Sequence, residues 1–345
     1  MAQEEWYVLL PQPIEEEALK ILKDAGLSVK IAPKPEPAVV APLIRKARAI
    51  ILRTGIALTE DLLEQAEDLW IISRTGAGVD NVDLKAATKK GVIVTSSLGV
   101  NATTVAEHAL SLILALFKQL FLLDGEVRRG NFGIRYKNYP QDVAGKKLGI
   151  VGFGRIGQAL AKNFYVISGT RVLAYDPFLS EDLKERFCDF VDFVNIEELL
   201  RTSDVVSIHV PLNDTTRNMI SWKELKLMKP EAYLVNVSRG GVVNEQDLIK
   251  ALKEKVIRGA GLDVFESEPP APDNPLLTMD NVILTPHAAA LTKECVVRMA
   301  TEAVRRVLTL LEGYIPDNIA NPEVLKMEKW RNLKRRKEGS EVEST

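Results

Sequence analysis

Cysteine is nearly absent from this sequence: Cys188 and Cys295 are the only two in 345 residues, far apart and in no recognisable motif. This scarcity excludes a disulfide framework and is typical of a reducing compartment. Histidine is also scarce, and the three histidines show no spacing typical of metal ligands, so we expect no bound metal. Because the N-terminus has neither a basic segment nor a cleavage site, we expect no signal peptide and a cytoplasmic protein.

An excess of one charge sign is also lacking, because the formal net charge is −2. No basic surplus indicates nucleic acid, and no charged block indicates a membrane surface. The apolar runs reach only about the length of a strand, far short of the ~18 residues that span a bilayer. We therefore expect neither nucleic acid nor a membrane as a partner.

The first hundred residues alternate strand-like apolar runs with amphipathic stretches. The strand-like runs are Trp6–Leu10, Val29–Ala32, Ala49–Leu52, Trp70–Ser73 and Val92–Thr95. The helical stretches are Ile14–Ala25, Val39–Lys46, Thr59–Gln65 and Leu84–Thr88. Such alternation predicts a parallel sheet with helices on both faces.

A long apolar helical pattern runs from Asn101 to about Leu123 and predicts one buried interdomain helix. The stretch Arg128–Val143 that follows it is polar and irregular, and we interpret it as an arm between domains or subunits.

A second α/β series starts at Lys147. Its strand-like runs are Leu148–Val151, Arg171–Tyr175, Asp204–His209, Tyr233–Val237, Gly259–Val264 and Val282–Thr285. A last helix, about Lys293–Leu311, would cross back to the first domain. The charged residues 325–345 are expected to form a frayed or disordered tail.

A glycine-rich motif follows the first strand of this second series. It reads Gly152-Phe153-Gly154-Arg155-Ile156-Gly157. Gly152 would permit a tight turn, Gly154 the approach of a pyrophosphate, and Gly157 close packing of helix on strand. Asp176 comes 19 residues later, at the end of the next strand, where a carboxylate accepts the ribose hydroxyls and repels a 2′-phosphate. We therefore expect NAD rather than NADP, although a glycine turn in a nucleotide-free domain gives the same pattern.

Hydride transfer to a 2-keto acid would need three kinds of side chain. One of each stands at the end of a strand of the second series. Arg239 is the cation for a carboxylate and a carbonyl, His287 a proton donor, and Glu268 its partner. Each alone has a plainer interpretation: a surface ion pair, a structural histidine and a solvated acidic turn.

Together, and in this order, these segments resemble the D-isomer-specific 2-hydroxyacid dehydrogenase family, and within it the D-3-phosphoglycerate dehydrogenases. The resemblance covers roughly residues 5 to 324. The segments that carry it are Gly76-Ala77-Gly78-Val79-Asp80-Asn81, Val105-Ala106-Glu107-His108, His209-Val210-Pro211-Leu212 and the three catalytic segments.

The resemblance implies a role for each residue. Arg239 would hold the substrate carboxylate and carbonyl, His287 would be the general acid or base, and Glu268 would orient His287 and stabilise its charged form. The cofactor would be contacted by Asp263 at the nicotinamide, Val210 and Pro211 near the adenosine, and the backbone of Val237. Backbone N–H groups of Gly76, Ala77 and Gly78 would bind the substrate carboxylate. His108 is interpreted as a satisfied buried histidine, and His209 as structural or on the adenosine side.

The substrate is less defined. Arg53 and Arg74 end strands of the first domain and match positions that hold a phosphate in phosphoglycerate dehydrogenases; pairing with nearby acids is the equal alternative. Arg135 matches a basic position that can reach a neighbouring subunit's site. Glyoxylate, hydroxypyruvate, lactate or a sulfonated hydroxy acid are also compatible. No segment matches the C-terminal regulatory domain of some phosphoglycerate dehydrogenases, so we expect no regulation of that kind.

The fold expected is two doubly wound α/β domains, with a Rossmann-type NAD domain at 101–289 inserted into a flavodoxin-like substrate domain formed by 1–100 and 290–324. The substrate would bind in the cleft between them, and the arm suggests a homodimer. One alternative from another class is an NAD-sensing binding protein, because corepressors with this fold keep the same three residues. Another alternative is a related dehydrogenase that acts on formate or phosphite. The formate enzymes have Gln in place of Glu268, which argues against that branch.

Overall fold

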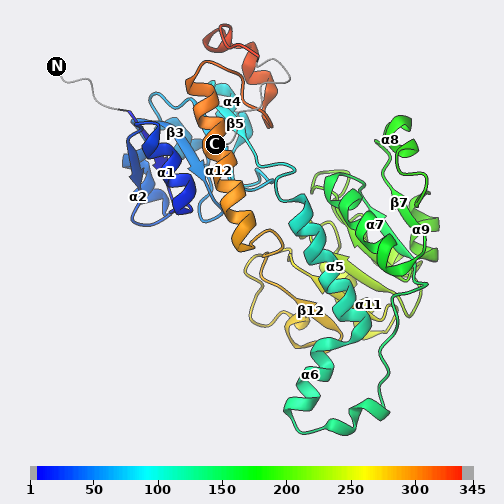
Figure 1. The fold of residues 1–345 in the computed structure, drawn as a ribbon. Coiled ribbons are helices and arrows are strands. Elements are labelled where there is room, and N and C mark those ends of the chain that lie inside the picture. Colours follow the sequence, from blue (N-terminus) through cyan, green and yellow to red (C-terminus); the bar gives the residue numbers. More distant parts are fainter. Residues whose placement is uncertain (1–5, 336–345) are drawn as a thin grey trace, which may run out of the picture. The chain divides into compact units, whose positions relative to one another are not determined.

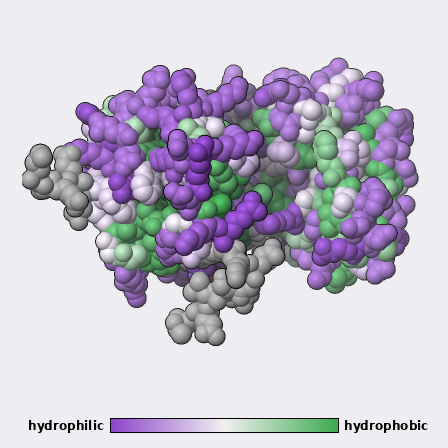
Figure 2. Space-filling model, turned by 90° about the horizontal axis from the view of Figure 1, so that it is seen from above, coloured by the Kyte–Doolittle hydropathy of each residue, from purple (hydrophilic) through white to green (hydrophobic). Residues whose placement is uncertain are grey.

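The computed structural model describes residues 6–335, which fall into two compact units (Figure 1). Unit 1 combines the chain up to Asn101 with the chain from Thr292 on, and unit 2 is the continuous segment Ala102–Leu291. Each unit has its own parallel sheet, so the expected class of two α/β domains is confirmed. In the space-filling view of Figure 2, hydrophilic residues predominate and hydrophobic ones gather in patches.

Unit 1 is built on five parallel strands in the order β2-β1-β3-β4-β5, the flavodoxin-like order. The strands are β1 (Tyr7–Leu10), β2 (Val29–Ile31), β3 (Ala47–Leu52), β4 (Ile71–Arg74) and β5 (Ile93–Thr95). The helices are α1 (Glu16–Asp24), α2 (Pro37–Ile44), α3 (Glu60–Glu64), α4 (Leu84–Lys89) and α12 (Lys293–Leu311), followed by the 3₁₀ turns η3 (Pro322–Lys326) and η4 (Glu328–Trp330).

Two apolar layers cover the two faces of this sheet, because side chains alternate along each strand. Leu9 and Ile50 pack with α2, α3 and α4 on one face, while Val8 and Ile51 pack with α1 and α12 on the other. The second layer therefore needs a helix that lies almost 200 residues further along the chain.

Unit 2 has seven parallel strands in the order β12-β11-β10-β9-β6-β7-β8. The strands are β6 (Leu148–Val151), β7 (Val172–Tyr175), β8 (Val191–Phe193), β9 (Val205–Ile208), β10 (Tyr233–Asn236), β11 (Gly259–Leu262) and β12 (Val282–Leu284). The first six, counted along the chain, have the order typical of dinucleotide-binding folds, which reverses between β6 and β9. Loops at the carboxyl ends of these two strands diverge and leave room for a ligand.

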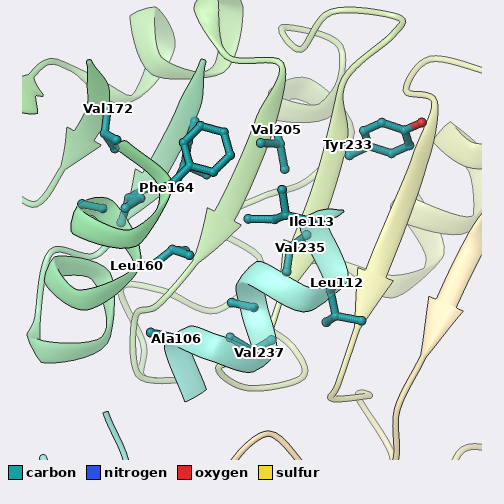
Figure 3. Packing of buried hydrophobic residues seen from close by; sticks show 14 of the residues in the cluster. Ala106, Leu112, Ile113, Leu160, Phe164, Val172, Val205, Tyr233, Val235 and Val237 are labelled. Atoms are coloured by element: carbon teal, nitrogen blue, oxygen red, sulfur yellow. The ribbon is translucent and has the colours of Figure 1, made fainter. Parts of the chain in front are cut away.

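Helices cover both faces of the second sheet. They are α5 (Ala102–Lys118), α6 (Leu120–Arg128), α7 (Arg155–Ser168), α8 (Glu181–Glu185), α9 (Ile196–Thr202), α10 (Trp222–Leu225) and α11 (Glu245–Lys253), with 3₁₀ turns η1 (Phe132–Tyr136) and η2 (Pro275–Thr278). Figure 3 shows how Ile113 of α5 and Phe164 of α7 share a core with Val205 and Val235 of the sheet. The apolar α5 is therefore a core helix of unit 2.

The single helix expected over residues 101–123 is wrong, because the chain breaks at Gln119. This residue adopts a left-handed conformation with φ 50°, and α6 starts beyond it at 58° to α5. Within the part of the chain described here, no single helix has both the length and the hydropathy to cross a membrane, and only this bent pair meets those criteria jointly. The break turns α6 and the arm after it away from the sheet (Figure 1).

Two further expectations need correction. The short strand β8 was not predicted, because Asp192 interrupts the short apolar run Phe190–Val194 and charged or polar residues lie on both sides of that run. The frayed tail expected from residue 325 is wrong as far as the structure describes it. Trp330 is only 6% exposed, donates its indole N–H to the Gly91 carbonyl at 2.9 Å, and meets Trp70 edge-to-face. The rest of the expected tail, 336–345, lies outside the described residues.

Replacing Trp330 with alanine tests this packing. We expect the free energy of unfolding of unit 1 to fall by about 3 kcal/mol, because a buried indole and its hydrogen bond are lost. Urea unfolding followed by circular dichroism measures the change. The neighbouring Arg331→Ala removes an exposed side chain and should cost less than about 0.5 kcal/mol. Equal stability of the two variants would contradict the packing.

Candidate functional site

The glycine-rich loop between β6 and α7 has the geometry of an anion site. Gly152 has φ +93°, and a Cβ there would lie 2.7 Å from the His209 carbonyl oxygen. A Cβ at Gly157 would collide with the backbone of Gly152, whereas one at Gly154 would meet nothing within 4 Å. The open side of Gly154, at the N-terminus of the 14-residue helix α7, is where free N–H groups and the helix dipole favour a pyrophosphate.

Asp176 stands directly after β7, beside this loop. Its carboxylate accepts hydrogen bonds from the N–H groups of Phe153 at 2.9 Å and Phe178 at 3.0 Å. These bonds hold the carboxylate at the rim of the glycine loop, where it suits a pair of ribose hydroxyls. Val210 lies across the loop, since its Cγ1 would be 2.7 Å from a Cβ on Gly152, and Pro211 after it is exposed. The residues present therefore fit a dinucleotide.

The remaining residues of the expected cofactor set have simple positions. Arg155 and Ile156 form the first turn of α7; the arginine is exposed, and the isoleucine packs against the core under the helix. Val237 is 6% exposed in that same core, so only its backbone is available to a ligand.

Arg239 is held by a tight turn after β10. The buried Asn236 side chain donates to the Arg239 carbonyl at 2.9 Å and accepts from the N–H and hydroxyl of Ser238. The guanidinium donates to the Ser238 carbonyl at 2.7 Å. A Cβ on Gly240 would collide with the backbone of Phe265, so this turn lies directly against the loop after β11.

His287 and Glu268 form a close pair at the same sheet edge. Glu268 Oε2 accepts a hydrogen bond from His287 Nδ1 at 2.7 Å, while Oε1 accepts from the Phe265 N–H at 3.2 Å. Because the carboxylate is an acceptor, the proton is on Nδ1, and Nε2 is the ring nitrogen left to exchange a proton with a substrate. The side chains of His287 and Glu268 are 43% and 38% exposed, so both can be reached from solvent.

The pKa of Glu268 reflects two opposing effects. Burial raises it, but the hydrogen bond and charge of His287, the Phe265 N–H and the charge of Arg239 outweigh burial and hold the pKa below its ordinary value. The carboxylate is therefore ionised throughout the neutral range and remains a hydrogen-bond acceptor for His287 Nδ1.

Asp263, which we expected to bind the cofactor on its nicotinamide side, has a carboxylate that is fully buried and surrounded by protein donors. Thr285 donates its hydroxyl to Oδ1 at 2.6 Å, and the N–H groups of Ala288 and Ala289 donate at 2.8 and 2.9 Å. Its backbone carbonyl accepts the His287 N–H at 2.8 Å. Asp263 thus holds the loop on which His287 adopts a left-handed φ of 52°.

The other two histidines have hydrogen-bond partners. His209 Nε2 lies 2.8 Å from the Ser207 hydroxyl, and burial lowers the pKa of His209 to about 3, so the ring is neutral. His108, on α5, lies with Nε2 3.0 Å from the hydroxyl of Thr285. Sequence reasoning did not pair His108 with Thr285, since 177 residues separate them along the chain.

In unit 1, both arginines considered for the substrate are engaged locally. Arg53 pairs with Glu15 at 2.9 Å, with its side chain 31% exposed. Arg74 is 7% exposed and donates from Nε to the Asn81 side-chain oxygen at 2.8 Å. Arg53 therefore pairs with a nearby acid, as the alternative interpretation expected. Arg74 makes a hydrogen bond to a side chain of its own unit.

The loop 76–78 follows β4 and is partly accessible. Within residues 6–335, no acceptor receives a hydrogen bond from the N–H groups of Gly76, Ala77 or Gly78. Three consecutive open N–H groups suit a carboxylate.

Glu268→Gln tests the electrostatics of the pair. A carboxyl group whose pKa is lowered by folding stabilises the native state above its unfolded pKa, and the contribution is lost as pH falls through the native pKa. We expect wild type to exceed Glu268→Gln in stability near pH 7, and the difference to shrink below about pH 4.5. Thermal unfolding across this range measures it. Glu185→Gln, an exposed carboxylate of α8, is the control. A difference that did not change with pH would contradict the assignment.

Comparisons with known proteins agree with this geometry. The model of the "D-isomer specific 2-hydroxyacid dehydrogenase, NAD binding domain" family matches residues 110–289. The chain is 38% identical over 329 residues to a D-3-phosphoglycerate dehydrogenase of Methanocaldococcus jannaschii, covering 95% of this chain and 62% of that one. It is 40% identical over 296 residues to a glyoxylate reductase of Korarchaeum cryptofilum, covering 85% and 88%.

Solved structures give the same result. A D-lactate dehydrogenase from Aquifex aeolicus, complexed with NAD and lactic acid, matches with a TM-score of 0.79 and 32% identity over 93% of this chain and 97% of that one. The chain spans less than two thirds of the length of two phosphoglycerate dehydrogenase relatives, 62% and 59%, but most of the glyoxylate reductases. The chain therefore belongs to the D-isomer-specific 2-hydroxyacid dehydrogenase family, and residues 110–289 are its NAD-binding domain.

Proposed function

We propose that the protein catalyses reversible hydride transfer between NAD(H) and the 2-carbon of a small D-2-hydroxy acid. The observation that carries this proposal is the 2.7 Å pair of His287 and Glu268, on the same sheet edge as Arg239 and the glycine-rich loop. A cation, a proton donor with an ionised partner, and a dinucleotide loop are the groups this reaction needs.

In this mechanism, the bound nicotinamide supplies the hydride in reduction and accepts it in oxidation. His287 Nε2 gives a proton to the carbonyl oxygen as the 2-keto acid becomes a 2-hydroxy acid, and takes it back in the reverse direction. Glu268 keeps the Nδ1 proton in place and stabilises the imidazolium. Arg239 binds the substrate carboxylate and polarises the carbonyl bond. Asp176 selects NAD, since it binds ribose hydroxyls and repels a 2′-phosphate.

The arginine contacts of unit 1 favour a substrate without a phosphate. A phosphate needs an exposed guanidinium fork. Arg74 is buried against Asn81, and the charge of Arg53 is balanced by Glu15. We therefore propose glyoxylate or hydroxypyruvate ahead of phosphohydroxypyruvate, with the N–H groups of residues 76–78 as further donors to the same substrate carboxylate. Relatives named glyoxylate reductase support this order of substrate preference. Relatives named D-3-phosphoglycerate dehydrogenase support the reverse order.

The test is NADH oxidation with a panel of glyoxylate, hydroxypyruvate, pyruvate, sulfopyruvate and phosphohydroxypyruvate. We expect the highest kcat/KM with glyoxylate or hydroxypyruvate. His287→Ala should lower kcat by at least about a hundredfold with NADH affinity kept, because only the proton donor is lost. NADH binding without turnover of any member would reject the enzyme and favour an NAD-sensing protein.

The matched variant for the substrate argument is Glu15→Gln. It removes the charge opposite Arg53 and should raise the relative kcat/KM for phosphohydroxypyruvate while the value for glyoxylate changes little. If wild type already preferred phosphohydroxypyruvate, the substrate order proposed above would be reversed.

We also propose that the protein is a homodimer formed through the arm of unit 2. Neither α6 nor η1 contains a buried residue, and five of their large apolar side chains are exposed. These are Leu120, Phe121, Val127, Phe132 and Tyr136, each 51–67% exposed. A cavity of about 240 Å³ lies beside the arm, lined by Leu116, Phe121 and Tyr233 among others. An exposed apolar arm and a cavity on the same chain suit a symmetric dimer, in which the arm of each copy fills the cavity of the other.

Phe132→Asp tests the dimer. We expect sedimentation at micromolar concentration to give a dimer for wild type and a monomer for the variant, because a buried charge would replace an aromatic contact. Val166→Asp, which changes a 77% exposed side chain on α7, is the control and should remain a dimer. A wild-type monomer would overturn this part of the proposal.

A further inference from the structure

A chain of hydrogen bonds links the core helix α5 to the catalytic loop. His108 Nε2 lies 3.0 Å from the Thr285 hydroxyl, which lies 2.6 Å from Asp263 Oδ1. His108 Nε2 is also 3.7 Å from that same carboxylate oxygen. The three side chains come from α5 and from the ends of β11 and β12, all within unit 2.

The direction of these bonds follows from the chemistry of each group. The Asp263 carboxylate can only accept, so Thr285 must give its hydroxyl proton to it. The Thr285 oxygen then has only lone pairs to offer to His108. His108 Nε2 must therefore carry a proton and donate it, and the bonds run from His108 through Thr285 to Asp263.

The end of this chain determines where the proton donor sits. Asp263 fixes the residues after His287, because it accepts the N–H groups of Ala288 and Ala289, and its carbonyl accepts the N–H of His287 itself. A buried carboxylate needs every one of its donors. If His108 no longer donates, the Thr285 oxygen loses its donor, and the orientation in which its hydroxyl points at Asp263 is held less firmly.

We propose that His108 is a positioning residue that acts through Thr285 and Asp263 to hold the His287 loop in its reactive geometry. This inference rests on the proposed hydride transfer, in which His287 gives the proton. Within residues 6–335 no hydrogen bond joins His108 directly to His287, so its effect is expected on kcat rather than on NADH affinity. A small displacement of a proton donor is enough to slow the reaction strongly.

The activity test compares three variants. In His108→Gln, the amide nitrogen reaches the position of Nε2, whereas in His108→Asn it reaches only that of Nδ1, and His108→Leu has no donor. We expect His108→Leu and His108→Asn to lower kcat by about tenfold or more at unchanged NADH affinity, and His108→Gln to restore most of it. Equal kcat in Gln and Leu would overturn the proposal, since loss of packing alone would produce that result.

A double-mutant cycle gives a second readout. Thr285→Val removes the central link, so Thr285→Val and the double variant with His108→Leu should have the same kcat. Multiplying effects would overturn the proposal, because they would mean that the two residues act independently.

The protonation state supplies a test that needs no activity. In the ¹⁵N spectrum of the NAD-free protein, assigned by single-histidine variants, His108 should carry a proton on Nε2, and Thr285→Val should shift the His287 signals. A His108 with a bare Nε2 would overturn the relay. If wild type turned over no 2-keto acid while these spectral results held, the proposed substrate chemistry would fail and the positioning geometry would stand.

Discussion

The site depends on one constraint, the burial of the Asp263 carboxylate. A carboxylate without solvent must be surrounded by donors, or its cost exceeds what a fold can tolerate. Here the donors come from Thr285 and from the N–H groups just after His287. The same hydrogen bonds therefore satisfy the buried carboxylate and position the proton donor. The strained φ of His287 persists because these neighbours determine it.

A second carboxylate at this edge has the opposite environment. Glu268 is partly exposed and bonded to an imidazole whose charge can change, so it responds to protonation. The Asp263 carboxylate is fully buried, and its hydrogen bonds hold the His287 loop in place. Such a division between neighbouring acids, set by environment rather than by residue type, is a recurrent way for one site to separate structure from proton transfer.

The sequence was sufficient for the features with local causes. The glycine loop follows from the spacing of three glycines within six residues, and the alternation of patterns predicts both parallel sheets. The sequence was insufficient for features whose structure depends on residues far away along the chain. The break at Gln119 interrupts a continuous apolar pattern, and Trp330 is ordered by Gly91 and Trp70, which lie some 240 and 260 residues earlier. The burial of Asp263 and Arg74 could not be predicted either, because their partners are set by tertiary packing.

The discontinuity of unit 1 has a consequence for how the chain is made. Its five strands are synthesised first, yet one face of their sheet is covered by α12, which leaves the ribosome only after the whole of unit 2. At roughly 5–20 residues per second, the part of that apolar face that α12 covers stays exposed for about ten seconds or longer. Unit 2, being continuous, can complete its sheet in the meantime. During synthesis, the half-finished unit 1 is thus the form of the protein most exposed to aggregation and most in need of a chaperone.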